Sequence, residues 1–131
     1  MPVKLPAVAF FSFALMAPYA FAEGSGEQVY QRVCAACHGT KFDKAPQLGD
    51  RKAWAPLIKE GQHELTAHAW VGVRNMPPRG GAPTMSLEAF ARAVAYMARE
   101  AGGKWRDPDA TMMARIEAEV KKHGDQGHKG H

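Results

Sequence analysis

The chain has 131 residues, of which 46% are hydrophobic and 23% are charged, and its formal net charge is +4 at pH 7. This length fits a single domain, and the interspersed charges, without a basic stripe that alternates with aromatic residues, exclude a typical nucleic-acid-binding protein. The positive excess lies in residues 23–106, which hold twelve Lys and Arg against eight Asp and Glu, whereas residues 107–131 hold four against five.

The first 22 residues have the pattern of a secretory signal peptide. Lys4 supplies positive charge, Ala7–Ala17 forms a short apolar core, and Ala20-Phe21-Ala22 is a small-x-small cleavage signal. An uncleaved membrane anchor is the alternative, but the apolar run is shorter than the ~20 residues of a spanning helix. We therefore expect cleavage after Ala22 and a mature chain of 109 residues that begins at Glu23 and has no transmembrane segment.

A short helix is predicted over Gly26–Ala36. Val29 and Val33 lie four residues apart, with Tyr30 beside them, so one side of the helix is apolar. This helix brings the cysteine pair to its end.

The most specific pattern in the chain is Cys34-Ala35-Ala36-Cys37-His38, which contains the only two cysteines. Two thiols at this spacing, followed by an imidazole, are the groups that covalent haem attachment needs. Each thiol adds across one haem vinyl group, and His38 becomes the proximal ligand of the iron. We therefore expect one haem c, held by two thioethers.

Other functions of the cysteine pair are less well supported. A thioredoxin-like redox pair requires a βαβ context, and no β-branched run precedes Cys34. A zinc site requires a second ligand pair at a suitable spacing, which the remaining histidines do not form. A structural disulfide would close so short a loop that it would stabilise the fold little.

Further along the chain, Gly39–Asp50 is rich in Gly, Pro and Asp and predicts a loop. Two short helices are expected over Lys52–Glu60 and Gln62–Val71, separated by Gly61. Asn75–Pro83 contains three prolines and two glycines, so it predicts neither helix nor strand.

A fourth helix is predicted from Ser86, as N-cap, to Ala101, before Gly102-Gly103 ends it. Apolar residues recur in it at spacings of three and four, which predicts a stripe that faces the core. These residues are Leu87, Phe90, Val94 and Met97.

Met76, in the proline-rich segment, is the candidate sixth ligand of the iron. A thioether is a soft ligand that favours reduced iron and raises its potential, and a loop braced by prolines would hold such a weak ligand in place. Met85, at the edge of the same loop, is the main rival.

Three other methionines and two histidines are weaker candidates for this position. Met97, Met112 and Met113 have helical spacing, which predicts core packing. His63 or His68 would give bis-histidine ligation, but a His on a polar helical stretch is more often solvated.

After Trp105, a fifth helix is expected, with Asp107 as N-cap and Pro108 at the first helical position. Its apolar stripe, formed by Met112, Met113, Ile116 and Val120, predicts packing on the domain itself. Folding over a haem edge and binding a partner are the alternatives.

The last residues are Gly-rich and contain His123, His128 and His131. Their composition predicts a solvated tail, and weak metal chelation by these three histidines is the alternative.

These patterns resemble the class I c-type cytochromes, specifically the small bacterial cytochrome c-five type. The resemblance rests on Cys34–His38, Ala45–Asp50, Trp54 and Asn75–Gly81, and it covers Gly26–Ala101. It implies an all-α fold with four core helices around one covalent haem, in which the first and last core helices cross near the haem edge. The helical extension at the C-terminus is additional.

The resemblance also implies roles for single residues. The carbonyl of Pro46 would accept a hydrogen bond from Nδ1 of His38, which fixes the ring and makes it a stronger donor. Trp54 and Arg79 would lie near the haem propionates, the alternatives being a packed indole and a solvated guanidinium. Some relatives have an extra cysteine pair near the Met loop, where this chain has Ala82-Pro83, so its loop rigidity is expected from proline alone.

The expected organisation is a signal peptide over 1–22, a cytochrome c domain over 23–106, and a helical extension with a His-containing tail over 107–131. With both axial positions filled by protein and no acid–base cluster nearby, no catalytic residue is expected. The chain is interpreted as a periplasmic one-electron carrier that docks briefly on redox proteins, a membrane-bound oxidase or reductase among them. The alternatives are a subunit of a larger oxidoreductase, and a haem sensor or peroxidase from which Met76 dissociates.

Overall fold

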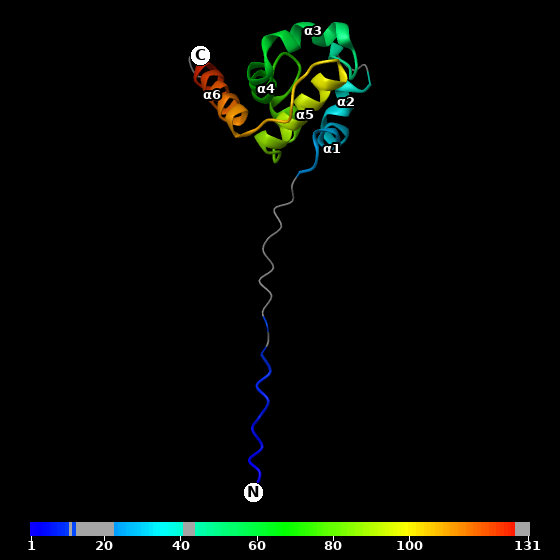
Figure 1. Ribbon diagram of the computed structural model, residues 1–131. Helices are drawn as coiled ribbons and strands as arrows, with labels where there is room; N and C mark the ends of the chain where they lie inside the picture. The colour runs from blue at the N-terminus through cyan, green and yellow to red at the C-terminus, as the bar shows by residue number, and fades with distance from the viewer. Residues whose placement is uncertain (11, 13–22, 41–43, 128–131) are drawn as a thin grey trace.

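The computed structural model describes residues 1–10, 12, 23–40 and 44–127. Residues 1–10 have no regular secondary structure and are exposed. Parts of the expected leader, including the cleavage signal Ala20–Ala22, and the tail residues His128 and His131 lie outside the described residues. From Glu23 onward the described chain folds into a helical body (Figure 1).

The first helical segment consists of α1 (Gly26–Val29), the π-helical turn η1 (Tyr30–Cys34) and α2 (Ala35–His38). Ser25 and Gln28 form a capping box at its start, each side chain bonding the other's backbone N–H. The backbone N–H of Ala35 bonds the carbonyl of Tyr30, five residues back. The predicted helix is thus confirmed and extends two residues further, to His38.

The next two helices are α3 (Arg51–Glu60) and α4 (Gln62–Val71), as predicted to within one residue. The carboxylate of Asp50 caps α3 by accepting from the backbone N–H of Ala53 at 3.1 Å. Gly61 separates the two helices with φ of 101°, a left-handed conformation that favours glycine.

The helix α5 (Leu87–Glu100) begins after Ser86, whose side chain accepts from the N–H of Ala89 at 3.1 Å, as predicted. Its apolar stripe is confirmed for Phe90, Val94 and Met97, each at most 3% exposed, whereas Leu87 at the start of the helix is half-buried. This stripe forms the centre of the core.

The first helix and α5 cross at a close contact, as the resemblance implied. A Cβ on Gly26 would lie 2.2 Å from the backbone oxygen of Arg92, so only glycine fits at the crossing. The rings of Tyr30 and Tyr96 meet beside it, with centroids 5.6 Å apart. Figure 1 shows α1 beside α5 in the helical body.

The last helix, α6 (Ala110–Gly127), starts two residues later than predicted. Asp109 caps it: its carboxylate accepts from the N–H of Met112 at 2.8 Å and its carbonyl from that of Met113 at 2.8 Å. The prediction of Asp107 as the cap is wrong, because Asp107 pairs with Arg99 at 3.0 Å instead. Pro108 therefore precedes the cap rather than opening the helix.

The helix α6 packs against α4 (Figure 1). Ile116 is fully buried in this contact, so the expectation that the extension packs on its own domain is confirmed.

The proline-rich segment differs from prediction in one respect. It contains a short 3-10 turn, η3 (Pro78–Gly81), in which Arg79 and Gly80 have left-handed backbone angles. Proline at the first position of the turn costs no hydrogen bond, which explains why a turn forms among prolines.

Candidate functional site

The two cysteines and His38 lie at the end of the first helical segment. Cys34 is buried and Cys37 is exposed, and both thiols are free. Burial, assisted by the neighbouring Cys37, raises the pKa of the Cys34 thiol to about 11. No disulfide joins the pair, so both sulfur atoms are available for other covalent chemistry.

His38 is fixed by the loop that follows it. Its Nδ1 lies 2.8 Å from the carbonyl oxygen of Pro46, which confirms the hydrogen bond that the resemblance implied. Because a carbonyl only accepts, Nδ1 carries the proton and Nε2 keeps a lone pair. His38 is only 8% exposed, so the ring is both oriented and shielded.

Gln47 fastens the same loop to the cysteine helix. Its Nε2 donates to the carbonyl of Cys37 at 3.0 Å and to that of Ala45 at 2.9 Å. The carbonyl of Gln47 in turn accepts from the indole N–H of Trp54 at 3.0 Å. Trp54 is 3% exposed, so its position matches the packed-indole interpretation, and its indole N–H is used within the protein.

Met76 lies in a tight turn. Two backbone hydrogen bonds close it: the N–H of Val73 donates to the carbonyl of Met76 at 3.1 Å, and the N–H of Met76 donates to that of Val73 at 2.9 Å. Arg74, between them, has φ of 52°. The expectation that proline alone stiffens the loop is therefore wrong, because this bridge constrains Met76 as well.

The rival methionines lie in different surroundings. Met85 is 8% exposed and belongs to the hydrophobic core, whereas Met76 is half-buried against that core. Met97 is a core residue, as predicted. Met112 and Met113 are half-buried on α6.

Arg79 is exposed but held in place. Its Nη1 donates to the carbonyl of Pro83 at 2.7 Å, and its guanidinium carbon lies 4.9 Å from the ring centroid of Trp70. Trp70 meets the ring of Phe90 edge-on, with centroids 5.3 Å apart. Trp70 was not predicted as a site residue; a large aromatic residue two positions before Gly72 was the available signal.

The turn η3 lies over the first helix. A Cβ on Gly80 would lie 3.5 Å from Val33 and 3.8 Å from Phe90. The segment that follows Met76 is therefore packed beside the helix that carries the cysteines.

The histidines considered for bis-histidine ligation are on α4. The ring of His68 lies against that of His123 on α6, with centroids 4.3 Å apart. His68 thus faces the C-terminal helix, and a bis-histidine site with His38 gains no support from this placement.

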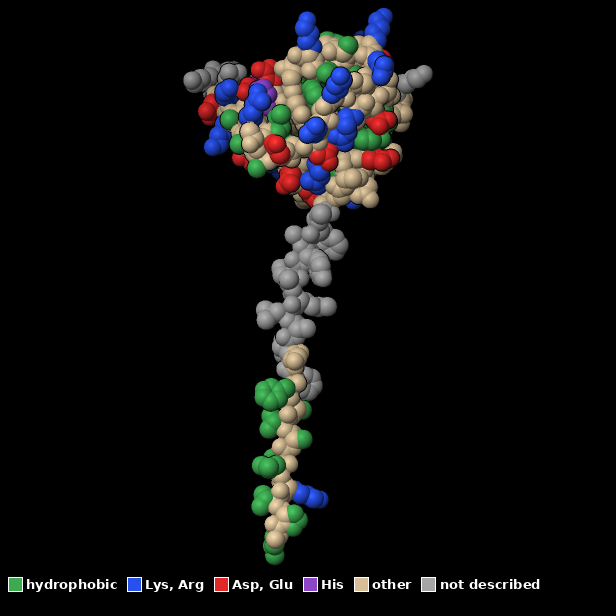
Figure 2. Space-filling model, in the orientation of Figure 1, with side chains coloured by type: hydrophobic (Ala, Val, Ile, Leu, Met, Phe, Trp, Pro, Cys, Tyr) green, Lys and Arg blue, Asp and Glu red, His purple; other side chains and the backbone are tan. Residues whose placement is uncertain are grey.

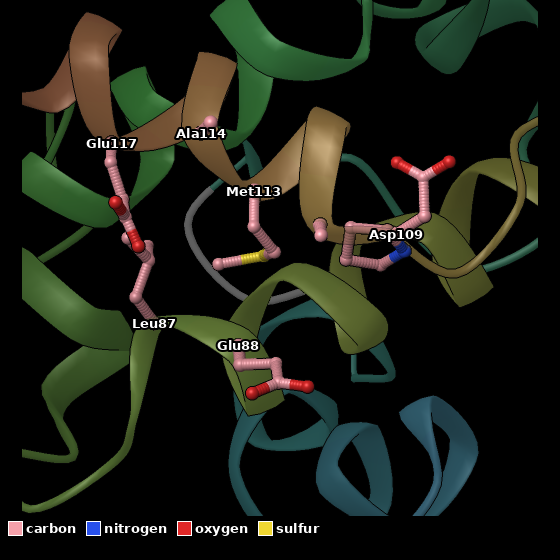
Figure 3. A pocket seen from close by; sticks show the side chains of 8 residues that line it. Leu87, Glu88, Asp109, Met113, Ala114 and Glu117 are labelled. Carbon is pink, nitrogen blue, oxygen red and sulfur yellow. The ribbon is translucent and has the colours of Figure 1, made fainter.

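A groove of about 480 Å³ lies between the first turn of α5 and α6 (Figure 3). Leu87 and Met113 supply apolar surface, and three carboxylates line the groove as well: Glu88, Asp109 and Glu117.

None of the described helices is long and apolar enough to span a membrane.

Comparisons with known proteins identify the family of this chain. A family model described as cytochrome c oxidase, cbb3-type, subunit III, matches residues 22–97, more than half of the chain. The chain belongs to the class I monohaem cytochromes c. Helix α6 lies beyond the matched range.

Two curated relatives of this cytochrome are similar over the same part of the chain. Cytochrome c-555 of Chlorobaculum thiosulfatiphilum is 38% identical over 77 residues, which cover 56% of this chain and 90% of the relative. Cytochrome c5 of Azotobacter vinelandii is 36% identical over 75 residues, which cover 56% of this chain and 90% of the relative.

A solved structure supports the fold. The cytochrome is similar to a chain in a crystal structure of an electron transfer complex of nitrite reductase with cytochrome c, with 41% identity and a TM-score of 0.56. The match covers 58% of this chain and 93% of that one. The expected all-α class I fold is confirmed.

Family membership also establishes the chemistry in outline. Cytochromes of this family carry covalently bound haem c and transfer electrons, so this chain is an electron-transfer protein and not an enzyme. The donor set fits the cofactor: two free thiols at one helix end, and an imidazole whose Nε2 keeps its lone pair.

Proposed function

We propose that this cytochrome is a periplasmic one-electron carrier in which Cys34 and Cys37 hold the haem through thioethers and His38 and Met76 are the axial ligands. Haem c supplies a one-electron iron couple. The observation that best supports the proposal is the hydrogen bond from Nδ1 of His38 to the Pro46 carbonyl, 2.8 Å long, at the end of the helix that carries both thiols.

His38 would act as the proximal ligand through Nε2. Its bond to Pro46 fixes the tautomer and increases electron donation from the ring. The loop that contains Pro46 is held from both sides. The side chain of Gln47 bonds the carbonyl of Cys37, and the indole of Trp54 on α3 bonds the carbonyl of Gln47. Trp54 would therefore contribute by positioning this loop.

Met76 would act as the distal ligand. The backbone bridge to Val73 limits the motion of the turn, so the thioether loses little conformational freedom when it binds iron. A ligand held in this way competes well with water and with small molecules. This favours an electron carrier over a sensor or peroxidase that releases Met76.

Arg79 would place a permanent positive charge near the haem propionates. Its stacking on Trp70 and its bond to Pro83 fix the guanidinium on the segment that follows Met76. Fixed positive charge near carboxylates stabilises their ionised form.

Export is supported by the attachment of Glu23, the residue that would begin the mature chain, to the folded domain. The carboxylate of Glu23 accepts from the backbone N–H of Ser86 at 3.0 Å and from its hydroxyl, and Arg32 donates to the carbonyl of Glu23. Glu23 directly follows the proposed cleavage after Ala22. We accordingly divide the chain into a signal peptide (1–22), a cytochrome domain (23–106) and an extension (107–131) that packs on the domain.

The test is an optical spectrum of the haem-loaded mature protein in both oxidation states, recorded before and after carbon monoxide is added. The proposal predicts low-spin spectra, a Met-to-ferric-iron charge-transfer band, and no change with carbon monoxide. Rapid carbon monoxide binding would refute a closed site and favour the sensor or peroxidase function.

A second candidate is a subunit permanently bound in a larger oxidoreductase. The matching family model is described as an oxidase subunit, and the acidic groove between α5 and α6 offers a surface separate from the haem site. Gentle purification from native membranes distinguishes the two: a stable stoichiometric complex supports the subunit, and a freely dissociating protein supports the carrier.

A further inference from the structure

A second group of ligand-type side chains lies at the contact between α4 and α6, apart from the haem site. The imidazoles of His68 and His123 meet edge to face, with centroids 4.3 Å apart. A carboxylate flanks each ring: Glu60 Oε2 lies 3.5 Å from Nδ1 of His68, and Glu119 Oε1 lies 3.5 Å from Nε2 of His123.

One atom of this group is buried without a hydrogen bond. Nε2 of His123 is inaccessible to solvent and has no hydrogen-bond partner. A buried polar atom without a partner costs free energy, so this nitrogen favours any ligand that can reach it. The side chains of His123 and Glu119 are 22% and 14% exposed, and that of His68 is 38% exposed, so the group lies close to the surface.

The spacing of these atoms suits a metal ion. Ligand atoms about 2.0–2.2 Å from a tetrahedral Zn²⁺ lie roughly 3.3–3.6 Å from each other. Nε2 of His123 and Oε1 of Glu119, at 3.5 Å, already have this separation. The other oxygen of Glu119 accepts from Lys122 at 2.9 Å, which orients the carboxylate.

His68 has the arrangement of a metal-bound imidazole. A histidine ligand ordinarily donates its second ring N–H to a carboxylate, which fixes the ring. Glu60 Oε2 lies 3.5 Å from Nδ1 of His68, an ion-pair distance, which leaves Nε2 of His68 as the nitrogen that can bind a metal.

We propose that His68, His123 and Glu119 bind one divalent transition-metal ion, of the Zn²⁺ class, between α4 and α6. Imidazole nitrogen and carboxylate oxygen are suitable ligands for Zn²⁺. Among the described residues no group of three such side chains is placed to hold an ion, so binding requires the His68 ring to turn toward His123 and Glu119. The ion would join the extension to the cytochrome domain.

The proposal is tested with the haem-loaded mature protein, stripped of metal by a chelator and titrated with Zn²⁺ by calorimetry. We expect one ion per protein and a raised melting temperature. His68→Gln and His123→Gln each lower the affinity at least about tenfold and abolish the thermal shift, with an unchanged haem spectrum as evidence of folding.

A truncation after Gly127 is the matched control, because it removes His128 and His131 and leaves the proposed ligands. It should bind Zn²⁺ as the full mature chain does. The proposal is overturned if truncation abolishes binding, which assigns the ion to the tail, if neither Gln variant weakens it, or if no ion binds.

Discussion

Nδ1 of His38 donates to the carbonyl oxygen of Pro46 over 2.8 Å, and the N–H of Leu48 donates back to the carbonyl of His38, also over 2.8 Å. The loop after the cysteine helix therefore holds both the ring and the backbone of this histidine. Such a double attachment fixes the ring plane before any ligand binds, which lowers the entropy cost of coordination.

Loosening the loop that holds His38 should lower the stability of the protein and change the reduction potential of the haem. In Gln47→Leu the bonds to the carbonyls of Cys37 and Ala45 are lost, and each is worth about 1 kcal/mol. We expect unfolding in urea at a lower midpoint and a higher reduction potential, because a less firmly held His38 donates less electron density to the ferric iron. Gln31→Leu, on the exposed side of the same helix, is the control, and an equal effect there would contradict the explanation.

The helix crossing should not tolerate a methyl group. Gly26→Ala places Cβ 2.2 Å from the Arg92 oxygen, so the first helix must shift away from α5 at a cost of about 1–3 kcal/mol. Gly124→Ala has no atom within 4 Å and should be neutral or slightly stabilising. Thermal unfolding of both variants measures the difference, and similar melting temperatures would argue against the crossing.

Acid should weaken the attachment of Glu23 to α5. Hydrogen bonds from the Ser86 side chain and backbone lower the pKa of this carboxyl below 4.5. A lowered pKa in the folded state contributes stability above pH 4.5, which is lost as the pH falls through the folded value. The stability advantage of the wild type over Glu23→Gln should therefore shrink below pH 4.5, and an advantage that is constant down to pH 2 would refute the linkage.

The two aspartates before α6 should differ in their effect on stability. Asp109→Ala removes a helix N-cap and should cost about 1 kcal/mol. Asp107→Ala removes an exposed ion pair with Arg99 and should cost less, since such pairs are worth about 0–1 kcal/mol. Urea unfolding of both variants checks the assignment, which the reverse order would contradict.

Local patterns in the sequence predicted much of the fold. The caps at Ser86, the break at Gly61 and the end of the first helix depend on neighbouring residues alone, and their placement was correct to within two residues. The prediction of Asp107 as the N-cap was wrong because the Arg99 side chain, eight residues earlier in the chain, pairs with its carboxylate.

The candidate site could be predicted only in part, because some of its contacts depend on tertiary structure rather than on local sequence. The cysteine motif is contiguous, whereas the Val73–Met76 bridge and the stacking of Arg79 on Trp70 depend on backbone angles and tertiary packing. The pairing of His68 with His123 joins two helices that no local pattern relates. The space-filling view shows why charge alone gave little guidance, since basic and acidic side chains alternate over the visible face (Figure 2).

The most direct test of the proposed ligation is the proton NMR spectrum of the reduced, haem-loaded mature protein. The ring current of the macrocycle shifts the methyl group of an iron-bound methionine far upfield. We predict one such resonance in the wild type, kept in Met85→Leu and lost in Met76→Leu, which should also gain carbon monoxide binding. A resonance that persists in Met76→Leu, or its absence from the wild type, would contradict His38/Met76 ligation.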